Sequence, residues 1–379
     1  GGIVLMVAPD ASLPDPSMTI FVLLALLAPA LYSTEANIVA RWGTYGLDPV
    51  QTIATDAPDH EGASSASEIL VSADGRFVYA GNRAENRIVV FAVDLVLPVS
   101  RKFLLGWLSV AGLGGAIAPS LALLWGEDQS MYGGLVQVDA YSLFFKCFFM
   151  VMGIFIILSS MDYVEKYLTH PGEYYGIMLF TIVGMMLMAA AGELLSAYIS
   201  LELLSFGLYV LVAYNRYNPK SNEAGTKYIL LGAFSSALLL YGISQIYGLT
   251  GTTRFDDINL ALSTSSGISP GLLVGLVFII AGLGFKVAAV PFHMWAPDAY
   301  EGAPLPITAF LSTASKAAGF ALILRLFTGA LVVDATEWRA AMAVLAAITM
   351  TAGNLIAIQQ TNLKRLIAYS SIGQVGYML

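Results

Sequence analysis

The sequence from Gly271 to Arg325 reads GLLVGLVFIIAGLGFKVAAVPFHMWAPDAYEGAPLPITAFLSTASKAAGFALILR. Two apolar segments of this stretch each carry one lysine, Lys286 and Lys316, and a proline-rich hinge separates them. A lysine at the centre of a membrane helix costs about 2.5–3.5 kcal/mol on insertion scales. We therefore expect a chain that places one in each of two neighbouring spans to use both. The working hypothesis is a proton or cation path through a membrane.

The composition of the chain is that of a membrane protein. Of its 379 residues, 57% are hydrophobic and 12% are charged, whereas soluble domains are about 45–50% apolar and about 25% charged. The net charge of −8 and the lack of a basic stripe argue against nucleic-acid binding. Cys147 is the single cysteine, so one chain can build neither a disulfide nor a thiolate metal site.

Apolar segments of spanning length follow one another after Pro98. About 17–25 residues cross the hydrocarbon core as a helix, and a helix satisfies its own backbone in lipid. The fold class that we predict is an all-α polytopic membrane protein, a helix bundle with a broken helix near Lys286–Pro291. The predicted spans are 104–124, 139–159, 174–193, 195–214, 227–248, 271–291, 304–327 and 339–359, with a ninth starting at 366.

Three segments make up the predicted domain organisation. Residues 1–40 contain an apolar run at 18–32, which is either a short transmembrane helix or an interfacial segment. Residues 41–97 are polar, with strands predicted at Glu68–Val71, Arg76–Ala80 and Arg87–Val93 as a small β-meander. Residues 98–379 form the transmembrane domain. Because the sequence opens with Gly and stops at Leu379 within an apolar run, we expect it to be a C-terminally truncated fragment.

Loop charges predict an orientation. An excess of Lys and Arg marks the cytoplasmic side of a membrane protein. Under the predicted alternation of spans, Arg254 and Arg339 fall on one side, which is therefore expected to face outward. The opposite, cytoplasmic group is Arg101, Lys102, Lys166, Arg216, Lys220, Lys364 and Arg365.

A glutamate and a third lysine join the two central lysines as candidate functional residues. Glu202 lies roughly 12 Å deep in its segment at about 1.5 Å per residue, whereas Lys227 begins a segment and can snorkel. Burial lowers the pKa of a lysine from about 10.4 and a nearby carboxylate raises it again. A lysine balanced between these effects can carry protons, and we expect Glu202 to be the carboxylate between Lys286 and Lys316.

Other polar residues near these groups receive simpler interpretations. Ser312, Thr313 and Ser315 are candidates to hold water around Lys316. His293 and Trp295, near a span end, are interpreted as an interfacial pair. Asp298 and Glu301 are expected to cap or solvate the hinge, and Glu193 is expected to be a solvated helix end.

Several of these motifs resemble a known family. GEYYGIMLFTIVGMMLMAAAGELLSAYISLELLSFGLYVLVAY, KYILLGAFSSALLLYGISQIYGLTGTT, GLGFKVAAVPFHMWAPDAYEGAPLPITAFLSTASKAAGFALILRL and GNLIAIQQTNLKRLIAYSSIGQVGYML are similar to the subunit N family of proton-pumping NADH:quinone oxidoreductase, complex I. This family is antiporter-like, and the resemblance covers about residues 100–379. It implies that Glu202 pairs with a lysine and that Lys227, Lys286 and Lys316 complete a proton relay. It also implies further helices, a second broken helix and another lysine beyond residue 379.

The resemblance implies a function for the whole complex. The chain is expected to be a multi-pass cell-membrane subunit that couples electron transfer from NAD(P)H to quinone to proton movement. Its expected partners are the other membrane-arm subunits and the lipid bilayer. It is expected to bind no cofactor and no metal, since it shows neither a cysteine cluster nor a placed GxGxxG motif. A sodium/proton antiporter subunit is the alternative within the same architecture.

A second resemblance concerns the polar stretch. SADGRFVYAGNR and IVVFAVD resemble one blade of a seven-bladed lactonase-type β-propeller. A propeller blade buries its faces against neighbouring blades, and only one blade is visible. A lactonase-type propeller fragment is therefore the alternative from another functional class, and a chimeric gene product explains this stretch better than a designed insertion.

Overall fold

The computed structural model describes residues 68–71, 78–81, 102–126, 128–264, 269–331 and 335–379. The chain divides into two compact units, Gly1–Pro98 and Val99–Leu379, and each is described by itself. The helix or interfacial segment expected at 18–32 and the strand expected at 87–93 lie outside the described residues.

A two-stranded antiparallel sheet is the described part of the first unit. Strand β1 is Glu68–Val71 and strand β2 is Val78–Gly81. Glu68 lies opposite Gly81, and Val71 lies opposite Val78. Strand β1 has the predicted bounds, and β2 begins two residues later and ends one residue later than predicted.

The second unit is helical, and its spans agree with the prediction from hydropathy. Among the described residues, 8 helices are long and apolar enough to cross a membrane, which confirms the all-α polytopic class. The helices are α4 Leu104–Ala122, α5 Ala140–Tyr167, α6 Pro171–Ala190, α7 Leu194–Val212, α8 Pro219–Thr250, α9 Phe255–Thr264, α10 Pro270–Val287, α11 Trp295–Gly302, α12 Leu305–Phe310, α13 Lys316–Arg325, α14 Ala335–Ile358 and α15 Leu363–Met378. Two π-helical stretches, Leu311–Ser315 and Leu326–Ala330, flank α13.

The helices begin where the sequence supplies capping groups. Asp139 accepts a hydrogen bond from the backbone of Ser142, whose hydroxyl bonds back to the Asp139 backbone as a capping box. Asn218 and Ser269 cap α8 and α10 by accepting a backbone hydrogen bond from Lys220 and Leu272, and each is followed by a proline in the first turn. These side chains satisfy amide groups that have no partner within the helix. Short β-strands, β3 Gln129–Met131 and β4 Val136–Val138, connect α4 to α5.

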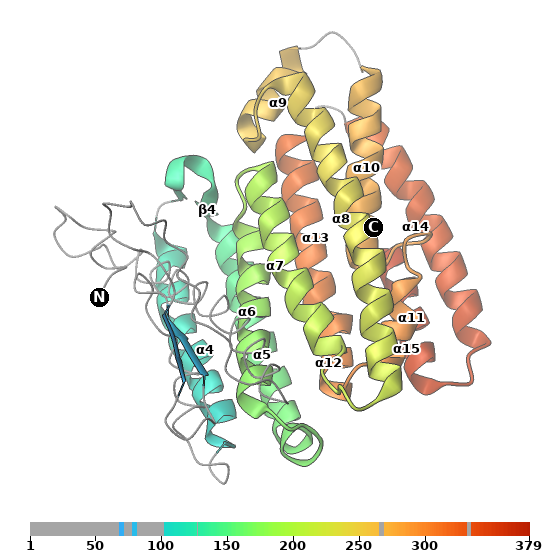
Figure 1. The fold of residues 1–379 in the computed structure, drawn as a ribbon. Helices are drawn as coiled ribbons and strands as arrows, with labels where there is room; N and C mark the ends of the chain where they lie inside the picture. The colour runs from blue at the N-terminus through green and yellow to red at the C-terminus, as the bar shows by residue number, and fades with distance from the viewer. Residues whose placement is uncertain (1–67, 72–77, 82–101, 127, 265–268, 332–334) are drawn as a thin grey trace, which may run out of the picture. The chain divides into compact units, whose positions relative to one another are not determined.

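Neighbouring helices pack in antiparallel pairs along the bundle (Figure 1). Helix α6 packs on α5 and α7, α10 packs on α8, and α14 packs on α15. Helix α13 contacts both α6 and α10, and it therefore lies inside the bundle. This position brings the segments that carry the central lysines into one packed region.

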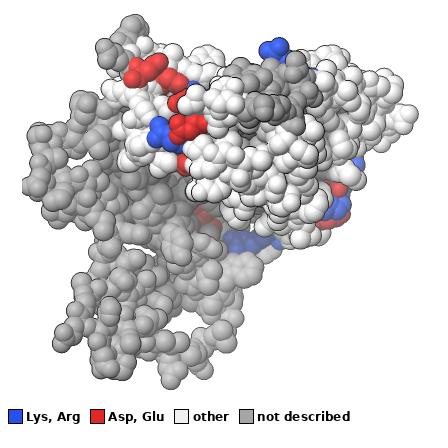
Figure 2. Space-filling model, turned by 90° about the horizontal axis from the view of Figure 1, so that it is seen from above, with Lys and Arg blue, Asp and Glu red and all other residues white. Residues whose placement is uncertain are grey.

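Basic residues collect at one end of the bundle. The Tyr214 hydroxyl donates to the His170 carbonyl at 2.6 Å, which joins the α5–α6 connection to the α7–α8 connection and so places Lys166, Arg216 and Lys220 at the same end. Lys364 and Arg365 join this end through contacts with α11 described below. Seen from the other end, where α9 lies, few charged side chains interrupt the described surface (Figure 2). This charge distribution agrees with the grouping predicted from the alternation of spans.

The predicted helix break lies directly after Lys286. Helix α10 ends at Val287, and Ala288 adopts a left-handed conformation with φ of 64°. The next helix begins at Trp295. Among the carbonyls that the break releases, that of Phe285 accepts a hydrogen bond from the Trp295 indole at 2.8 Å. The backbone amide of Val290 in turn donates to the Thr349 hydroxyl on α14 at 3.0 Å.

Trp295 is part of the protein interior, so its interpretation as an interfacial residue is wrong. The side chain is 1% exposed and stacks on Tyr228 of α8 with ring centroids 4.4 Å apart. The polar edge of the indole reaches a backbone carbonyl at the break, which is why so large a side chain can be buried there. His293 is partly exposed, with its ring 6.3 Å from that of Tyr369.

Ion pairs hold α11 at the basic end of the bundle. Asp298 binds Lys227 at 3.0 Å and Arg365 at 2.6 Å. Glu301 binds Lys220 at 3.0 Å and Arg365 at 3.2 Å. We call these five residues the hinge ion cluster. Asp298 and Glu301 do more than cap or solvate the hinge, because they tie α11 to α8 and α15.

Lys364 adds a helix-end contact beside the hinge ion cluster. Its ammonium group donates to the carbonyls of Glu301 and Ala303 at 3.1 Å and 3.0 Å. A cation is favourable at the C-terminus of a helix, where carbonyl groups lack partners within the helix. The short α11 is thus fixed at its acidic side chains and at its C-terminal end.

Replacing Trp295 tests the importance of the hydrogen bond at the break. The substitution Trp295→Phe removes the indole hydrogen bond to the Phe285 carbonyl, which keeps the Ala288 amide as a second donor at 3.0 Å, and it should lower the free energy of unfolding by about 0.5–1.5 kcal/mol. Trp107, at 54% exposure, supplies the control substitution Trp107→Phe, expected to stay within about 0.5 kcal/mol of the parent. Thermal unfolding of the purified chain in detergent measures both. Equal midpoints for the two variants would contradict this account.

The hinge ion cluster predicts a loss of stability in acid. Burial raises the pKa of Asp298, but Lys227 and Arg365 hold it below its usual value overall, and the hydrogen bond from Lys220 lowers the pKa of Glu301. The two carboxylates therefore stabilise the fold fully above their pKa values in the unfolded chain, about 3.9 for Asp and 4.3 for Glu. This stabilisation is lost as the pH falls through their lower pKa values in the folded chain.

Unfolding midpoints measured from neutral pH to about pH 3 check this prediction, since they should fall only in the acid limb. Asp298→Asn should flatten that limb. The control Asp162→Asn removes an exposed ion pair to Lys166 and should leave the limb unchanged. An acid limb that persists in full in Asp298→Asn would show that other carboxylates cause it.

Candidate functional site

Lys286 lies in the last turn of α10, directly before the break. It is 2% exposed, and its ammonium group donates to the Ser205 hydroxyl of α7 at 3.0 Å. Ser205 passes its own hydrogen to the Leu201 carbonyl at 2.7 Å. The lysine thus reaches a neutral hydroxyl on a neighbouring helix, and among the described residues it forms no ion pair.

Glu202 lies one turn before Ser205 on α7, close to the lysine. Its carboxylate accepts a hydrogen bond from the Ser236 hydroxyl of α8, and it interacts electrostatically with Lys286. Glu202 was expected to lie as a direct partner between the lysines. In the structure, Ser205 binds the lysine and Ser236 binds the acid, because each hydroxyl is nearer to its charged group.

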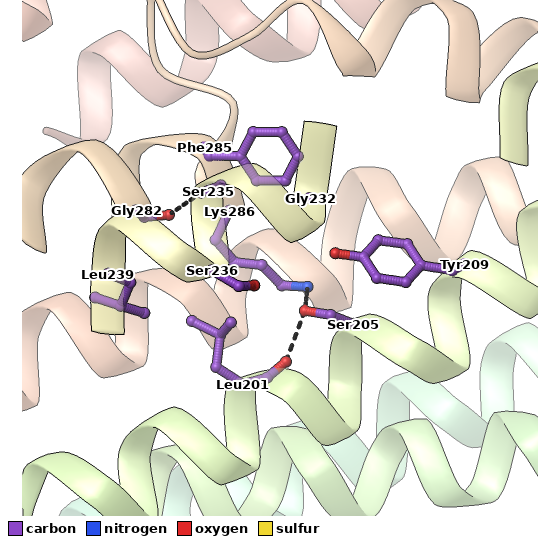
Figure 3. A pocket seen from close by; sticks show the side chains of 10 residues that line it. All are labelled: Leu201, Ser205, Tyr209, Gly232, Ser235, Ser236, Leu239, Gly282, Phe285 and Lys286. Carbon is purple, nitrogen blue, oxygen red and sulfur yellow. Dashed lines mark hydrogen bonds between the residues drawn. The ribbon is translucent and has the colours of Figure 1, made fainter. Parts of the chain in front are cut away.

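A small cavity separates these hydrogen-bonded groups (Figure 3). Polar groups line it from three helices, together with apolar side chains and two glycines. In the close-up, the Lys286 ammonium points into the space between Ser205 and Ser236, and the Tyr209 hydroxyl faces it from the other side. The lining residues are Leu201, Ser205, Tyr209, Gly232, Ser235, Ser236, Leu239, Gly282, Phe285 and Lys286.

Lys316 occupies a second buried position, at the start of α13. It is 3% exposed, and its ammonium group donates to the Ser371 hydroxyl of α15 at 2.5 Å. The same group lies 5.8 Å from the centroid of the Tyr300 ring, a distance at which a cation interacts favourably with an aromatic face. As with Lys286, the described residues contain no carboxylate paired with this lysine.

The hydroxyl groups near Lys316 differ in their suitability for holding water. Ser312 and Thr313 donate back to the Ala309 carbonyl at 2.9 Å and 2.8 Å, and Thr313 is exposed. Ser315 is 1% exposed, and its oxygen, like the hydroxyl of Tyr300, is buried without a hydrogen-bond partner among the described residues. Of the three residues expected to hold water, Ser315 is the one whose position suits that role, because unsatisfied buried hydroxyls are the groups that ordered water binds.

Lys227 lies apart from the other candidate residues. Its side chain is 46% exposed and pairs with Glu223 at 2.6 Å and with Asp298 at 3.0 Å. It belongs to the hinge ion cluster at the basic end of the bundle. Of the four predicted site residues, Lys286 lines the cavity and Glu202 binds Ser236, another of the lining residues. Lys316 is buried on α13, and Lys227 is at the surface.

Glu193 differs from the prediction of a solvated helix end. It is 7% exposed and caps α7 by accepting from the Ser196 amide at 3.2 Å. Its second oxygen accepts from the Thr253 hydroxyl at 2.5 Å. The α8–α9 connection covers this helix start, which explains why a carboxylate at a tight junction is buried and fully bonded.

Two buried charged groups were not singled out from the sequence. Lys146 in α5 is 4% exposed, and Arg325 at the end of α13 pairs with Asp139. Lys146 carries the same signal as Lys286 and Lys316, a lysine inside an apolar segment of spanning length. The Arg325 pair had no such signal, because its partners come from sequence positions far from the arginine.

Comparisons with known families and proteins agree with the sequence motifs. Residues 191–379 match a family model described as NADH:quinone oxidoreductase/Mrp antiporter, TM. Residues 36–97 match the model of the lactonase, 7-bladed β-propeller. NADH-quinone oxidoreductase subunit N of Moorella thermoacetica is 47% identical over 290 residues, covering 76% of this chain and 60% of that protein.

Solved structures extend the comparison to the fold. A chain of respiratory complex I from Thermus thermophilus with bound aureothin superposes with a TM-score of 0.63 at 33% identity, over 76% of this chain and 60% of that chain. A chain of the Mrp complex from Dietzia sp. shares the fold with a TM-score of 0.66 at 20% identity, over 76% of this chain and 56% of that chain.

These matches cover only part of the relatives' length. The chain spans about 60% of the length of the curated relatives it matches. Residues 191–379, which match the family model, contain the break after Lys286 and the buried Lys286 and Lys316. The chain is thus similar, over about three quarters of its length, to antiporter-like membrane subunits that include subunit N of NADH:quinone oxidoreductase.

Proposed function

We propose that this chain is a proton-translocating membrane-arm subunit of an NADH:quinone oxidoreductase in a cell membrane. The observation that carries the proposal is the burial of Lys286 and Lys316, at 2% and 3% exposure, with hydroxyl groups as their hydrogen-bond partners. Charged side chains within membrane helices are costly and face pathways, cavities or partners. Two such lysines, of which Lys286 lines a cavity, together with a partly buried glutamate suit the transfer of protons.

The proposed relay uses Glu202, Lys286 and Lys316 in the interior, with Lys227 at the basic end. Lys286 lines the cavity on Ser205, and Glu202 binds Ser236, another lining residue, so a movement of either side chain would exchange a hydroxyl partner for an ionic one. The charged form of the lysine is favoured when the carboxylate is near and disfavoured when it is not. The relay therefore couples side-chain position to proton uptake and release. Lys227, through Asp298, would supply protons at the surface.

Partners would provide the redox chemistry. We propose that other subunits of the complex oxidise NAD(P)H, reduce quinone and hold the redox cofactors. The oxidation of the nicotinamide by quinone supplies free energy, and this chain uses it to move protons. The relatives' names support this division, since they are subunits of such an oxidoreductase.

An antiporter subunit is the second candidate function. The family model that matches residues 191–379 names both kinds of protein, and the Mrp fold is shared. A sodium/proton antiporter needs sodium for proton movement, whereas the proposed function does not. Proton movement that requires sodium and continues without NADH would favour the antiporter.

Residues 41–97 have no assigned role in this proposal. We propose that they are a segment of foreign origin with no lactonase activity, because the matched region corresponds to one blade of a seven-bladed architecture. An uninterrupted reading frame in the gene, found across codons 41–97 in independent isolates, would argue against a chimera.

Lysine-to-arginine substitutions separate a proton carrier from a structural cation. Arginine keeps the positive charge but does not release its proton, since its pKa is about 12.5 or above. We expect Lys286→Arg and Lys316→Arg to assemble and yet to reduce the protons moved per NADH oxidised several-fold, as Lys286→Ala and Lys316→Ala should do. Acid-pulse or dye measurements in inverted membrane vesicles check this.

The control for these variants is Lys166→Arg, which alters an exposed lysine, with 60% side-chain exposure, on α5. It should pump as the parent does. Normal pumping by an assembled protein that carries both Lys286→Arg and Lys316→Arg would remove the relay from the mechanism.

A further inference from the structure

A partly buried ion pair lies at the end of α13 that is remote from Lys316. Arg325 is the last residue of α13, and its guanidinium group pairs with the Asp139 carboxylate at the start of α5. Its Nε donates to the Ala191 carbonyl at the end of α6, at 3.2 Å. The group also lies 5.4 Å from the centroid of the Tyr141 ring. One side chain thus binds α13 to the ends of two other helices.

A second contact joins α13 to α5 one turn before Arg325. The Tyr141 hydroxyl donates to the Ala321 carbonyl at 2.8 Å. Arg325 and Asp139 are largely buried, with side-chain exposures of 14% and 26%. A charged pair of this kind is strongly destabilising to break, because the remaining charge is left without a partner. The Arg325 end of α13 is therefore bound to α5 at two successive turns, through Ala321 and Arg325.

Two π-helical stretches flank α13 and make its position depend on this attachment. Leu311–Ser315 precedes α13, and Leu326–Ala330 follows it. A π-turn contains an additional residue relative to an α-turn, and such turns occur at functional sites. The axial position of the segment between them is consequently not set by a continuous α-helix, and contacts with its neighbours have to set it.

Helix α13 also approaches the site of the other central lysine. A Cβ atom on Gly319 would lie 2.7 Å from a methyl group of Val287 and 3.5 Å from Cγ of Lys286. The α13 backbone therefore passes directly beside the end of α10. An axial movement of α13 would carry Lys316 along and change its position relative to Lys286.

We propose that Arg325, Asp139 and Tyr141 form an anchor that sets the axial position of α13 and thereby places the Lys316 ammonium group relative to Lys286. The anchor acts through the helix, since nine residues separate Lys316 from Arg325, or roughly 14 Å at about 1.5 Å per residue. This inference rests on the proposed function for the role of Lys316. Arg325, Asp139 and Tyr141 are positioning residues and do not carry the proton.

Charge neighbours predict an order of effects within the anchor. Lys146, on the same helix as the cap Asp139, interacts electrostatically with Asp139 and with Arg325. Asp139 thus serves as the counter-ion near two cations. Asp139→Asn removes the carboxylate that neutralises both Lys146 and Arg325. Arg325→Gln removes one cation, and the Asp139 carboxylate still neutralises Lys146. The larger effect should come from Asp139→Asn.

The position of α13 can be measured with spin labels in the assembled complex that contains this chain. Phe144 of α5 and Leu324 of α13 are 61% and 47% exposed, so Phe144→Cys and Leu324→Cys labels should be tolerated, with Cys147→Ala in every variant. We expect Asp139→Asn and Arg325→Gln to change the distance between these labels by at least one residue rise, about 1.5 Å. Labels at Phe206→Cys of α7 and Phe234→Cys of α8 form the control pair, which should not change.

The functional measurement is the number of protons moved per NADH oxidised. Asp139→Asn should lower this ratio several-fold, Arg325→Gln should lower it less, and Arg325→Lys, which keeps a cation, should restore most of it. Lys166→Gln removes the exposed pair with Asp162 and should have no effect. Tyr141→Phe, which loses only a hydroxyl, provides a mild variant if the charge variants fail to assemble, with a smaller change in label distance and ratio.

The outcomes separate this inference from the proposed function. Normal pumping by Lys316→Ala would overturn the proposed function, while the label distance still tests whether the anchor positions α13. If Lys316→Ala is inactive and the anchor variants keep both the parental label distance and the parental ratio, the anchor inference is overturned and the relay remains. If the charge variants fail to assemble, a parental label distance and a parental proton ratio in Tyr141→Phe would likewise overturn the anchor inference.

Discussion

The cost of placing an ammonium group inside a membrane is the constraint on which this structure depends. Lys286 and Lys316 each need a polar partner, and in both cases a residue of another helix supplies the hydrogen bond. Lys286 on α10 reaches Ser205 on α7, and Lys316 on α13 reaches Ser371 on α15. Because an unpaired polar group in hydrocarbon costs several kcal/mol, these contacts fix which helices lie side by side around the lysines.

The helix break next to Lys286 follows the same logic. A break releases backbone groups that lipid cannot satisfy, and Trp295 and Thr349 bind two of them. The hinge ion cluster then holds the short α11 against α8 and α15. The broken helix is thus stabilised because side chains from other helices bind backbone groups that the break releases.

The sequence alone predicts the spans well, since helix length and hydropathy are local properties. The predicted span at 271–291 differs from α10, Pro270–Val287, only where the break removes residues from the helix. The hydroxyl partners were not predictable, because Ser205 and Lys286 are 81 residues apart and many serines in apolar segments look alike. The burial of Glu193 and the pairing of Lys227 with Asp298 likewise depend on which loops and helices meet, which hydropathy does not specify.

Charged pairs and neutral partners occupy different depths in the bundle. The carboxylates of Asp139, Asp298 and Glu301 lie at or near helix ends, where arginines and lysines bind them. In the interior, the central lysines bind serines. An ion pair broken in a buried place leaves an uncompensated charge, whereas a hydroxyl exchanges for water at a smaller cost. Strong pairs at the ends keep the helices in place, and weak partners in the middle leave the ammonium groups free to change neighbours. This division suits the relay that we propose, because a relay held by ion pairs throughout would be too costly to rearrange.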